Sequence, residues 1–246
     1  MKNQYFGDIN DYRKYGLLRA ISSVSNLRTL VAWMLTLDDG STNGKFTKYL
    51  SEPQQWSKYD PELYSHLSQI LSTHSERKVK YIEETNLLKN TEYYSKLVPD
   101  LALDRDTWFV ELLQNSKDCD FVFLDPDNGL EIKSKPYGRK NSSKFLFWRE
   151  VESLWQSEKS LLTYQHFIRE KRVNFIQRML ETLKEATNGS FVEAFSTPHV
   201  VFLLALQPKH QPLHGAIVES VQKNWSGQIK HWELIRATQL HVSGKI

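Results

Sequence analysis

The stretch Phe121-Val-Phe-Leu-Asp125-Pro-Asp127-Asn128-Gly129 predicts both a buried strand and the polar turn that ends it. Its first four residues form a short apolar run bounded by turn residues, which is typical of a strand in the interior of a sheet. The strand should stop at Asp125, because the following proline fixes φ and has no amide hydrogen to donate. Gly129 then allows a tight bend. The carboxyl end of this strand therefore carries two carboxylates and a carboxamide in a rigid turn.

Short apolar runs and amphipathic segments alternate along the rest of the chain. We expect strands at residues 29–37, 79–83, 121–124, 161–164, 191–195 and 200–206, and a partly strand-like tail at 229–242. We expect helices at residues 11–25, 45–50, 61–72, 106–115, 145–155, 170–187 and 215–224. This alternation predicts an α/β fold with a mostly parallel sheet covered on both faces, and the last two strands predict an antiparallel closing pair. No linker divides residues 1–246, so a single domain is expected.

The composition excludes several classes of protein. A single cysteine, Cys119, excludes a disulfide framework or a cysteine zinc site within one chain, and we expect it to be a packed thiol. The N-terminal residues contain no apolar signal segment, and no stretch approaches the roughly 20 apolar residues of a membrane helix. We therefore expect a cytoplasmic protein. The net charge of +3 does not by itself indicate nucleic-acid binding, although a local basic patch is compatible with it.

Three of the expected strands end in polar clusters. These clusters are Asp38-Asp39-Gly40, Asp125-Pro-Asp127-Asn128 and Tyr164-Gln-His166. In a parallel sheet the carboxyl ends of the strands share one edge, where ligands bind. This convergence is the strongest functional indication in the sequence. Each cluster also has a purely structural interpretation, because Asp-Pro-Asp-Asn-Gly is common in turns and a strand-end histidine is often only hydrogen bonded locally.

The loop Gly40-Ser-Thr-Asn-Gly44-Lys45 follows the first expected strand. It matches neither Gly-x-Gly-x-x-Gly nor Gly-x-x-x-x-Gly-Lys-Ser/Thr, so an ordinary loop and a ligand-binding loop both stay open. The basic residues after His166, which include Arg169 and Arg172, could contact phosphate or form the solvated first turn of a helix. The dense polar and aromatic N-terminal segment, residues 1–26, is expected to fold over the ligand edge, although a capped helix start is the simpler interpretation.

Three motifs together resemble a known family. Gly7-Asp8-Ile-Asn-Asp11-Tyr-Arg-Lys14-Tyr-Gly-Leu-Leu-Arg19 is similar to the N-terminal segment of the ribosomal RNA adenine-amino methyltransferases that act on large-subunit RNA. The strand end at Asp125-Pro-Asp127-Asn128 resembles their Asp-Pro-Pro-Tyr motif, and the segment from Leu161 to Arg172 resembles their late strand. The order and rough spacing match up to about Trp225. The sequence also resembles a group of uncharacterised bacterial proteins with Tyr-Phe-Gly-Asp and Asp-Pro-Asp-Asn-Gly.

The resemblance implies a Rossmann-like three-layer methyltransferase-type fold that binds S-adenosylmethionine and acts on RNA or DNA. It places Asp38, Asp39, Gly40 and Gly44 beside the cofactor, and Glu83 or Glu84 at its ribose hydroxyls. It places Asp125, Asp127 and Asn128 where they would hold the target amino group near the methyl donor. Among the catalytic candidates, His166 or Asp127 is the expected base. The resemblance makes Lys14 a substrate or cofactor contact. From their positions in the sequence, we expect further substrate contacts at Tyr5, Asp8, Tyr164, Arg169 and Arg172. Two motifs depart from the family pattern: Asp-Asp-Gly-Ser replaces Gly-x-Gly, and Asp127-Asn128 replaces the Pro-Tyr whose aromatic ring stacks on the target base.

Two other classes of function are compatible with the same residues. A metal-dependent phosphodiesterase or nuclease would use Asp38, Asp39, Asp125 and Asp127 around magnesium or manganese. A nuclease-type arrangement of Pro126-Asp127 with Glu131-Ile-Lys133 is disfavoured, because only a few residues separate its two halves. A non-catalytic binding protein would reuse the enzyme fold without its chemistry.

Overall fold

The computed structural model describes residues 1–41 and 44–235 of the chain. Its strands form a seven-stranded central sheet and a small two-stranded sheet. The central strands are β1 (Thr29–Ala32), β2 (Thr91–Tyr94), β3 (Phe121–Leu124), β6 (Ser160–His166), β7 (Phe191–Ser196), β8 (Val200–Leu206) and β9 (Lys230–Glu233). The small sheet pairs β4 (Gly129–Leu130) with β5 (Phe145–Leu146).

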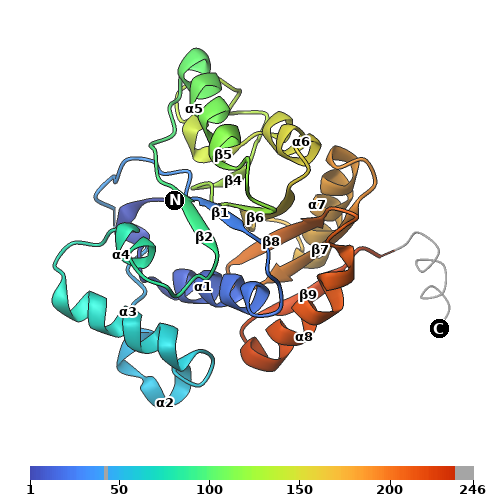
Figure 1. The fold of residues 1–246 in the computed structure, drawn as a ribbon. Coiled ribbons are helices and arrows are strands. Elements are labelled where there is room, and N and C mark those ends of the chain that lie inside the picture. The colour runs from blue at the N-terminus through green and yellow to red at the C-terminus, as the bar shows by residue number, and fades with distance from the viewer. Residues whose placement is uncertain (42–43, 236–246) are drawn as a thin grey trace.

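The central sheet has the strand order β2-β1-β3-β6-β8-β7-β9 (Figure 1). Strands β2, β1, β3 and β6 are mutually parallel. Strand β8 runs antiparallel between β6 and β7, and β9 runs antiparallel to β7 at the edge. The mostly parallel sheet and the antiparallel pair at residues 191–206 confirm the sequence prediction. The carboxyl ends of five strands and the starts of β8 and β9 lie at one edge of the sheet.

Helices cover both faces of the sheet and give a three-layer Rossmann-like fold (Figure 1). One face packs against α1 (Ile9–Ser22), α3 (Pro61–Thr73), α8 (His214–Trp225) and the short helices α2 (Pro53–Trp56) and α4 (Lys80–Glu83). The other face packs against α5 (Ala102–Asn115), α6 (Trp148–Gln156) and α7 (Arg172–Ala186). Short 3-10 turns lie at Asn3–Tyr5, Lys48–Ser51, Ser142–Lys144 and Gln211–Leu213. Among the described residues, no helix is long and apolar enough to cross a membrane.

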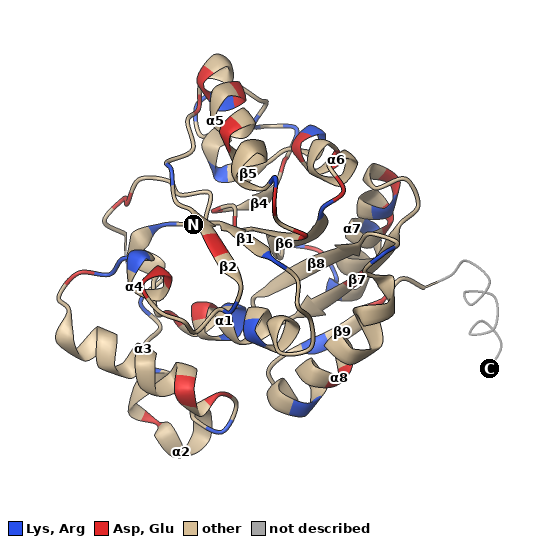
Figure 2. Cartoon of the chain, in the orientation of Figure 1, with Lys and Arg blue, Asp and Glu red and all other residues tan. Residues whose placement is uncertain are grey.

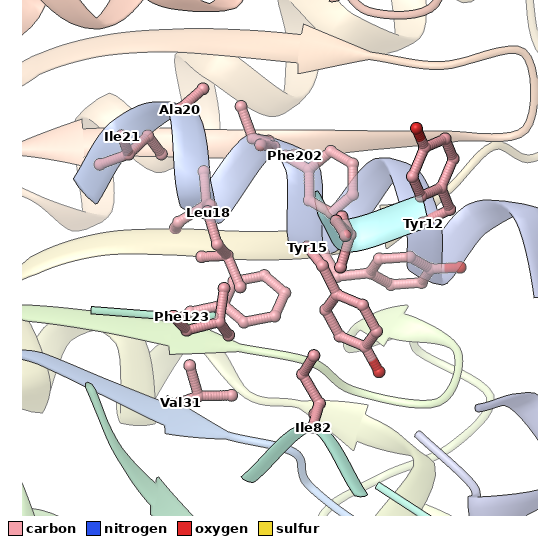
Figure 3. Packing of buried hydrophobic residues seen from close by; sticks show 14 of the residues in the cluster. Tyr12, Tyr15, Leu18, Ala20, Ile21, Val31, Ile82, Phe123 and Phe202 are labelled. Atoms are coloured by element: carbon pink, nitrogen blue, oxygen red, sulfur yellow. The ribbon is translucent and has the colours of Figure 1, made fainter. Parts of the chain in front are cut away.

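The strand residues alternate between the two faces, so neighbouring side chains enter different cores. Val31 and Phe123 pack under α1, whereas Leu30 and Val122 pack toward the opposite layer. Figure 3 shows Tyr15 and Leu18 of α1 lying over Val31 and Phe123. Because both faces are buried, β1, β3 and β8 read as continuous apolar runs in the sequence.

The connections around β1 and β3 create a crevice at the edge of the sheet. The chain leaves β1 toward the α1 face and reaches β2, and it leaves β3 through β4, β5 and α6 on the other face to reach β6. The two neighbouring strands β1 and β3 are therefore followed by segments that diverge to opposite faces. Such a topological switch point is where ligands bind in open α/β sheets.

Several expected boundaries are wrong. In the strand expected at 79–83, residues 80–83 form helix α4 instead, because the buried Val79 and Ile82 have the spacing of one helical turn. The second strand is instead β2, an edge strand that lacks a continuous apolar run and buries fully only Tyr94. The strand expected at 29–37 ends at Ala32, because Met34 takes a positive φ of 46°. The helix expected at 145–155 begins only at Trp148, after β5. In the expected tail, β9 accounts for residues 230–233, and residues 236–242 lie outside the described residues.

Gly16 marks a close contact between α1 and α8. A Cβ atom on Gly16 would lie 1.8 Å from Cζ2 of Trp225. We expect Gly16→Ala to lower the free energy of unfolding by about 1–3 kcal/mol, because overpacking forces rigid side chains apart. Gly215, which lies in α8 with open space around it, is the matched control. Gly215→Ala should be neutral or stabilising by up to about 1 kcal/mol. Equal urea midpoints for the two variants would contradict the packing argument.

Candidate functional site

A cavity of about 410 Å³ opens at the carboxyl edge of the sheet. Its walls come from the N-terminal residues and α1, from the loop that precedes the turn at Lys48–Ser51, and from the ends of β3, β6 and the β7–β8 turn. The lining residues are Met1, Tyr5, Asp8, Asn10, Asp11, Lys14, Gly44, Phe46, Asp125, Pro126, Asp127, Tyr164, His166 and His199. Polar groups and aromatic rings are mixed in this lining, as in sites that bind small molecules.

Lys14 is the centre of a buried ion cluster in this cavity. Its Nζ lies 2.8 Å from Oδ1 of Asp11 and 2.7 Å from Oδ2 of Asp125. All three residues are at most 2% exposed. Burial disfavours the ammonium charge, but the two carboxylates outweigh it and raise the pKa of Lys14. Asp11 also accepts hydrogen bonds from the amide of Gly7 and the hydroxyl of Tyr15. The cluster therefore ties α1 to the carboxyl end of β3.

Residue 1 lies in the switch-point crevice. The amino group of Met1 donates to the carbonyl oxygens of Met34 at 3.3 Å and Asp125 at 2.9 Å. Met34 follows β1 and Asp125 follows β3, so Met1 lies across the ends of both strands. The Met1 carbonyl also accepts from the amide of Thr36. Burial lowers the pKa of the amino group to about 6. A ligand that enters this crevice has to displace residues 1 and 2.

Lys2 connects the loop after β1, which contains Asp39, to the turn after β3. Its Nζ lies 2.7 Å from Oδ2 of Asp39 and 3.3 Å from Oδ2 of the buried Asp127. It also donates to the hydroxyl of Tyr5. The hydrogen bond from Lys2 lowers the pKa of Asp39. Gln4 adds a second connection, because its side-chain amide donates to Asp39. The N-terminal residues thus bridge the loop after β1 and the turn after β3.

The four aspartates of the phosphodiesterase hypothesis are bound by groups of the protein. Asp38 accepts from the amide of Gln4, Asp39 and Asp127 contact Lys2, and Asp125 contacts Lys14. Within residues 1–41 and 44–235, no group of three or more His, Cys, Asp or Glu side chains is arranged to hold a metal ion. The described residues therefore contain no preformed set of metal ligands of the kind that the phosphodiesterase hypothesis requires.

The turn after β3 is held by backbone and side-chain contacts. The amide of Asn128 donates to the carbonyl of Lys144, and Gly129 and Leu130 pair with β5. Gly129 has a φ of 102°, and a Cβ atom there would lie 2.4 Å from Oε1 of Gln165. The same oxygen accepts from the amide of Leu130 at 2.6 Å. Glycine is needed at position 129 for both conformation and space, so Gln165 can fix the turn against β6.

Two histidines face the cavity from the far side. His166 ends β6, and its Nε2 lies 3.3 Å from the hydroxyl of Tyr164. One side of the imidazole reaches solvent, but burial of the rest lowers the pKa of His166, so the ring is neutral near pH 7. Burial raises the pKa of Tyr164 well above its ordinary value. His199 enters from the turn that joins β7 to β8.

Glu83 reaches the ends of β1 and β2 from the short helix α4. Its Oε1 accepts a hydrogen bond from Nε1 of Trp33 at 2.7 Å and another from the hydroxyl of Ser95. Trp33 follows β1 and Ser95 follows β2, so the carboxylate lies at the edge where the ribose contact was expected, although it does not end a strand. Glu84 is exposed and pairs with Lys80 at 3.0 Å.

The cavity brings together eight of the residues singled out in the sequence. These are Tyr5, Asp8, Lys14, Gly44, Asp125, Asp127, Tyr164 and His166. Asp38, Asp39 and Gly40 lie outside its lining, on the loop bound by Lys2 and Gln4. Asn128 is exposed next to it, Arg169 is exposed on the segment after β6, and Arg172 donates to the carbonyl of Pro198. Glu83 and Glu84 lie away from it.

Five residues that line the cavity were not expected to do so from the sequence: Met1, Asn10, Phe46, Pro126 and His199. Pro126 was expected only to end the strand. A signal existed for His199, because the residue just before an antiparallel strand lies at the same edge as the carboxyl ends of its neighbours. Met1 and Phe46 carry no local pattern that would reveal their position.

A scan against protein-family models found no matching family, and a search of curated proteins found no similar one.

Proposed function

We propose that this protein is an S-adenosylmethionine-dependent methyltransferase that acts on a nucleic acid. The observation that carries the proposal is the position of Asp125-Pro126-Asp127, which follows β3 at the switch point and lines a cavity with His166. In the family that the sequence resembles, the corresponding motif positions the acceptor amino group. The Rossmann-like sheet with its antiparallel β8–β7 pair agrees with the fold that this resemblance implies.

The cofactor would supply a methyl group on a sulfonium centre. Glu83 fits the ribose end, because it lies at the ends of β1 and β2 and both of its protein hydrogen bonds go to Oε1. Trp33 and Ser95 hold the carboxylate in place. The loop at Asp38 and Asp39 is bound to Lys2 and Gln4, so residues 1–4 must move before this loop can contact the cofactor.

The acceptor would lie in the cavity. Neutral His166 has a lone pair that can take the proton that an acceptor nitrogen loses. Asp125 is held by Lys14, so we assign it a positioning role rather than that of a base. Asp127 is buried and contacts Lys2, and its carboxylate oxygens are acceptors for an amino group.

Calorimetric titration with S-adenosylmethionine tests the cofactor site directly. We expect binding by the wild type and a loss of about tenfold or more in affinity for Glu83→Gln, because a hydrogen bond to a charged group is replaced by a neutral one. Glutamine keeps the oxygen that Trp33 and Ser95 contact, so the fold should be unaffected. Glu84→Gln is the matched control and should bind like the wild type. Absence of binding at millimolar ligand would overturn the proposal.

A second candidate is a non-catalytic nucleic-acid-binding protein on the same fold. It is favoured by Met1 and Lys2, which fill the switch-point crevice, and by the absence of glycine at positions 38 and 39. This candidate predicts that nucleic acid binds while S-adenosylmethionine does not. One titration with S-adenosylmethionine and one with a nucleic acid therefore distinguish this candidate from the methyltransferase.

A further inference from the structure

Two basic segments lie at the carboxyl edge of the sheet next to the cavity. The β4–β5 loop, residues 131–144, has five basic residues and one acidic residue. The β6–α7 segment, residues 167–172, has three basic residues and one acidic residue. Together they carry a net charge of +6, whereas the whole chain carries only +3. The rest of the molecule is therefore net acidic, and the positive charge is concentrated at this edge.

The two segments begin close to each other in space, beside Gln165. The β4–β5 loop follows Leu130, whose amide donates to Oε1 of Gln165 at 2.6 Å. The β6–α7 segment begins one residue after His166, at the end of the strand that contains Gln165. The far end of the β4–β5 loop returns to the site, because Nζ of Lys144 lies 4.0 Å from Oδ2 of Asp127. Both segments therefore border the turn that lines the cavity.

Most of these cations are not neutralised by the protein. In the part of the chain that the structure describes, six of them form neither an ion pair nor a side-chain hydrogen bond: Lys133, Lys135, Arg139, Lys140, Arg169 and Lys171. The two acidic residues are occupied elsewhere: Glu131 accepts from the amide of Trp148, and Glu170 pairs with Arg178. Helices α5 and α6, in contrast, carry both signs of charge (Figure 2). The six cations are free to contact an external anion.

The β4–β5 loop is fixed in place before any ligand binds. Asp100 accepts hydrogen bonds from the amides of Asn141 and Ser143, both at 2.8 Å. The hydroxyl of Tyr137 donates to Asp106 of α5 at 2.6 Å. Gly138 packs so closely on Ala102 that a Cβ atom would lie 2.8 Å from its side chain. Binding to an ordered loop requires less loss of conformational entropy than binding to a mobile one.

We propose that the two basic segments bind the phosphodiester backbone of a single-stranded nucleic acid, with one unstacked base in the cavity. This proposal rests on the proposed function and specifies its substrate. Unpaired lysine and arginine side chains are the usual partners of phosphate oxygens. A base inside a duplex cannot reach a pocket of this kind, whereas an unstacked base can. Tyr5 and Phe46 provide aromatic surface for that base in the cavity lining.

Fluorescence anisotropy with a labelled single-stranded RNA of about 15 nucleotides, and with DNA of the same sequence, tests the surface without cofactor. A quadruple variant, Lys133→Glu, Lys135→Glu, Arg139→Glu and Lys140→Glu, should weaken binding by about 100-fold or more near 0.1 M salt. The slope of log affinity against log salt concentration should fall by roughly 0.7 for each phosphate that the variant no longer neutralises. Changing the same four residues to glutamine should give a smaller reduction in the same direction, and it guards against misfolding from charge reversal.

A control variant makes the same charge change at the opposite edge of the sheet. Lys89, Lys117, Lys184 and Lys209 are exposed and follow or precede strands at that edge, so all four are changed to glutamate. This variant should keep the affinity of the wild type within about threefold, since its cations lie at the opposite ends of the strands and salt screens charges over about 10 Å at 0.1 M. Equal reductions in both variants, or an unchanged affinity in the loop variant, would overturn the proposal.

Two further outcomes are informative. Binding to a duplex of the same sequence as tight as to the single strand would refute the single-stranded substrate. Loop-dependent binding to vesicles with anionic lipid, without binding to either oligonucleotide, would assign the surface to a membrane and overturn the proposal. Because none of these measurements contains S-adenosylmethionine, failure here is distinguishable from failure of the cofactor titration.

Discussion

Lys14→Met is expected to lower the free energy of unfolding by about 3–5 kcal/mol, because it leaves the buried carboxylates of Asp11 and Asp125 without their counter-ion. For a chain of this length, the change corresponds to a decrease in Tm on the order of 10 °C. Methionine preserves much of the volume and the apolar stem of lysine, so a change in packing contributes little. Thermal unfolding followed by circular dichroism measures the change.

The pH dependence of the Lys14→Met variant distinguishes the removal of charge compensation from a change in packing. Burial already raises the pKa of Asp11 in the wild type, and removal of the nearby ammonium raises it further. A carboxyl group whose pKa is raised in the folded state stabilises it below the unfolded pKa and loses this contribution as pH rises through the folded pKa. The variant should therefore lose less stability at pH 5 than at pH 8. The exposed Lys89 provides the control, since Lys89→Met should change stability by less than about 0.5 kcal/mol.

Arg105→Met is the second substitution with a large expected effect. The guanidinium of Arg105 holds both carboxylate oxygens of Glu150, at 2.8 and 2.9 Å, and donates to the carbonyl of Phe145. Arg105 and Glu150 are each 1% exposed. Removal of one partner leaves the other charge buried and unpaired, so we expect a destabilisation of about 3–5 kcal/mol in urea unfolding. The double variant Arg105→Met, Glu150→Leu should recover most of this stability.

The same two helices supply a matched exposed ion pair. Arg149 of α6 contacts Asp106 of α5 at 2.5 Å, and both side chains are more than half exposed. Arg149→Met should cost only about 1 kcal/mol, because exposed ion pairs contribute little and the stacking of Arg149 on Tyr137 adds a modest amount. If the two arginine variants were equally destabilised, burial would not be the cause of the difference.

Elements with a strong local pattern were predictable from the sequence. The strand at Phe121–Leu124 and the helix at Pro61–Thr73 were identified closely, because an apolar run before Asp-Pro and an apolar face after a helix cap are local signals. The antiparallel pair β7–β8 was also predicted, since two apolar runs flank a short polar turn. Strand β2 was missed, because it is held by pairing with β1 and not by any pattern of its own.

The site was predictable only where residues follow strands directly. Asp125, Asp127 and His166 end strands that share an edge, so their proximity follows from the parallel sheet. The ion pairs of Lys2 and Lys14 with these carboxylates join residues more than 100 positions apart. Contacts between residues so far apart leave no periodic pattern in the sequence. Glu83 illustrates the same limit. It lies in the short helix α4 between β1 and β2, whereas the sequence predicts a strand at this position.

The uneven charge of the molecule also bears on how fast a ligand reaches it. Two segments at one edge hold a charge of +6 while the whole chain holds +3, so the molecule has a pronounced electric dipole. A polyanion that diffuses toward such a molecule experiences a torque that turns the positive edge to face it, and productive encounters become more frequent than for a uniformly charged particle. Salt weakens this long-range orientation within about 10 Å at 0.1 M ionic strength, while contacts inside the cavity are screened much less. The rate of association and the lifetime of a complex at this edge are therefore governed by different groups of residues.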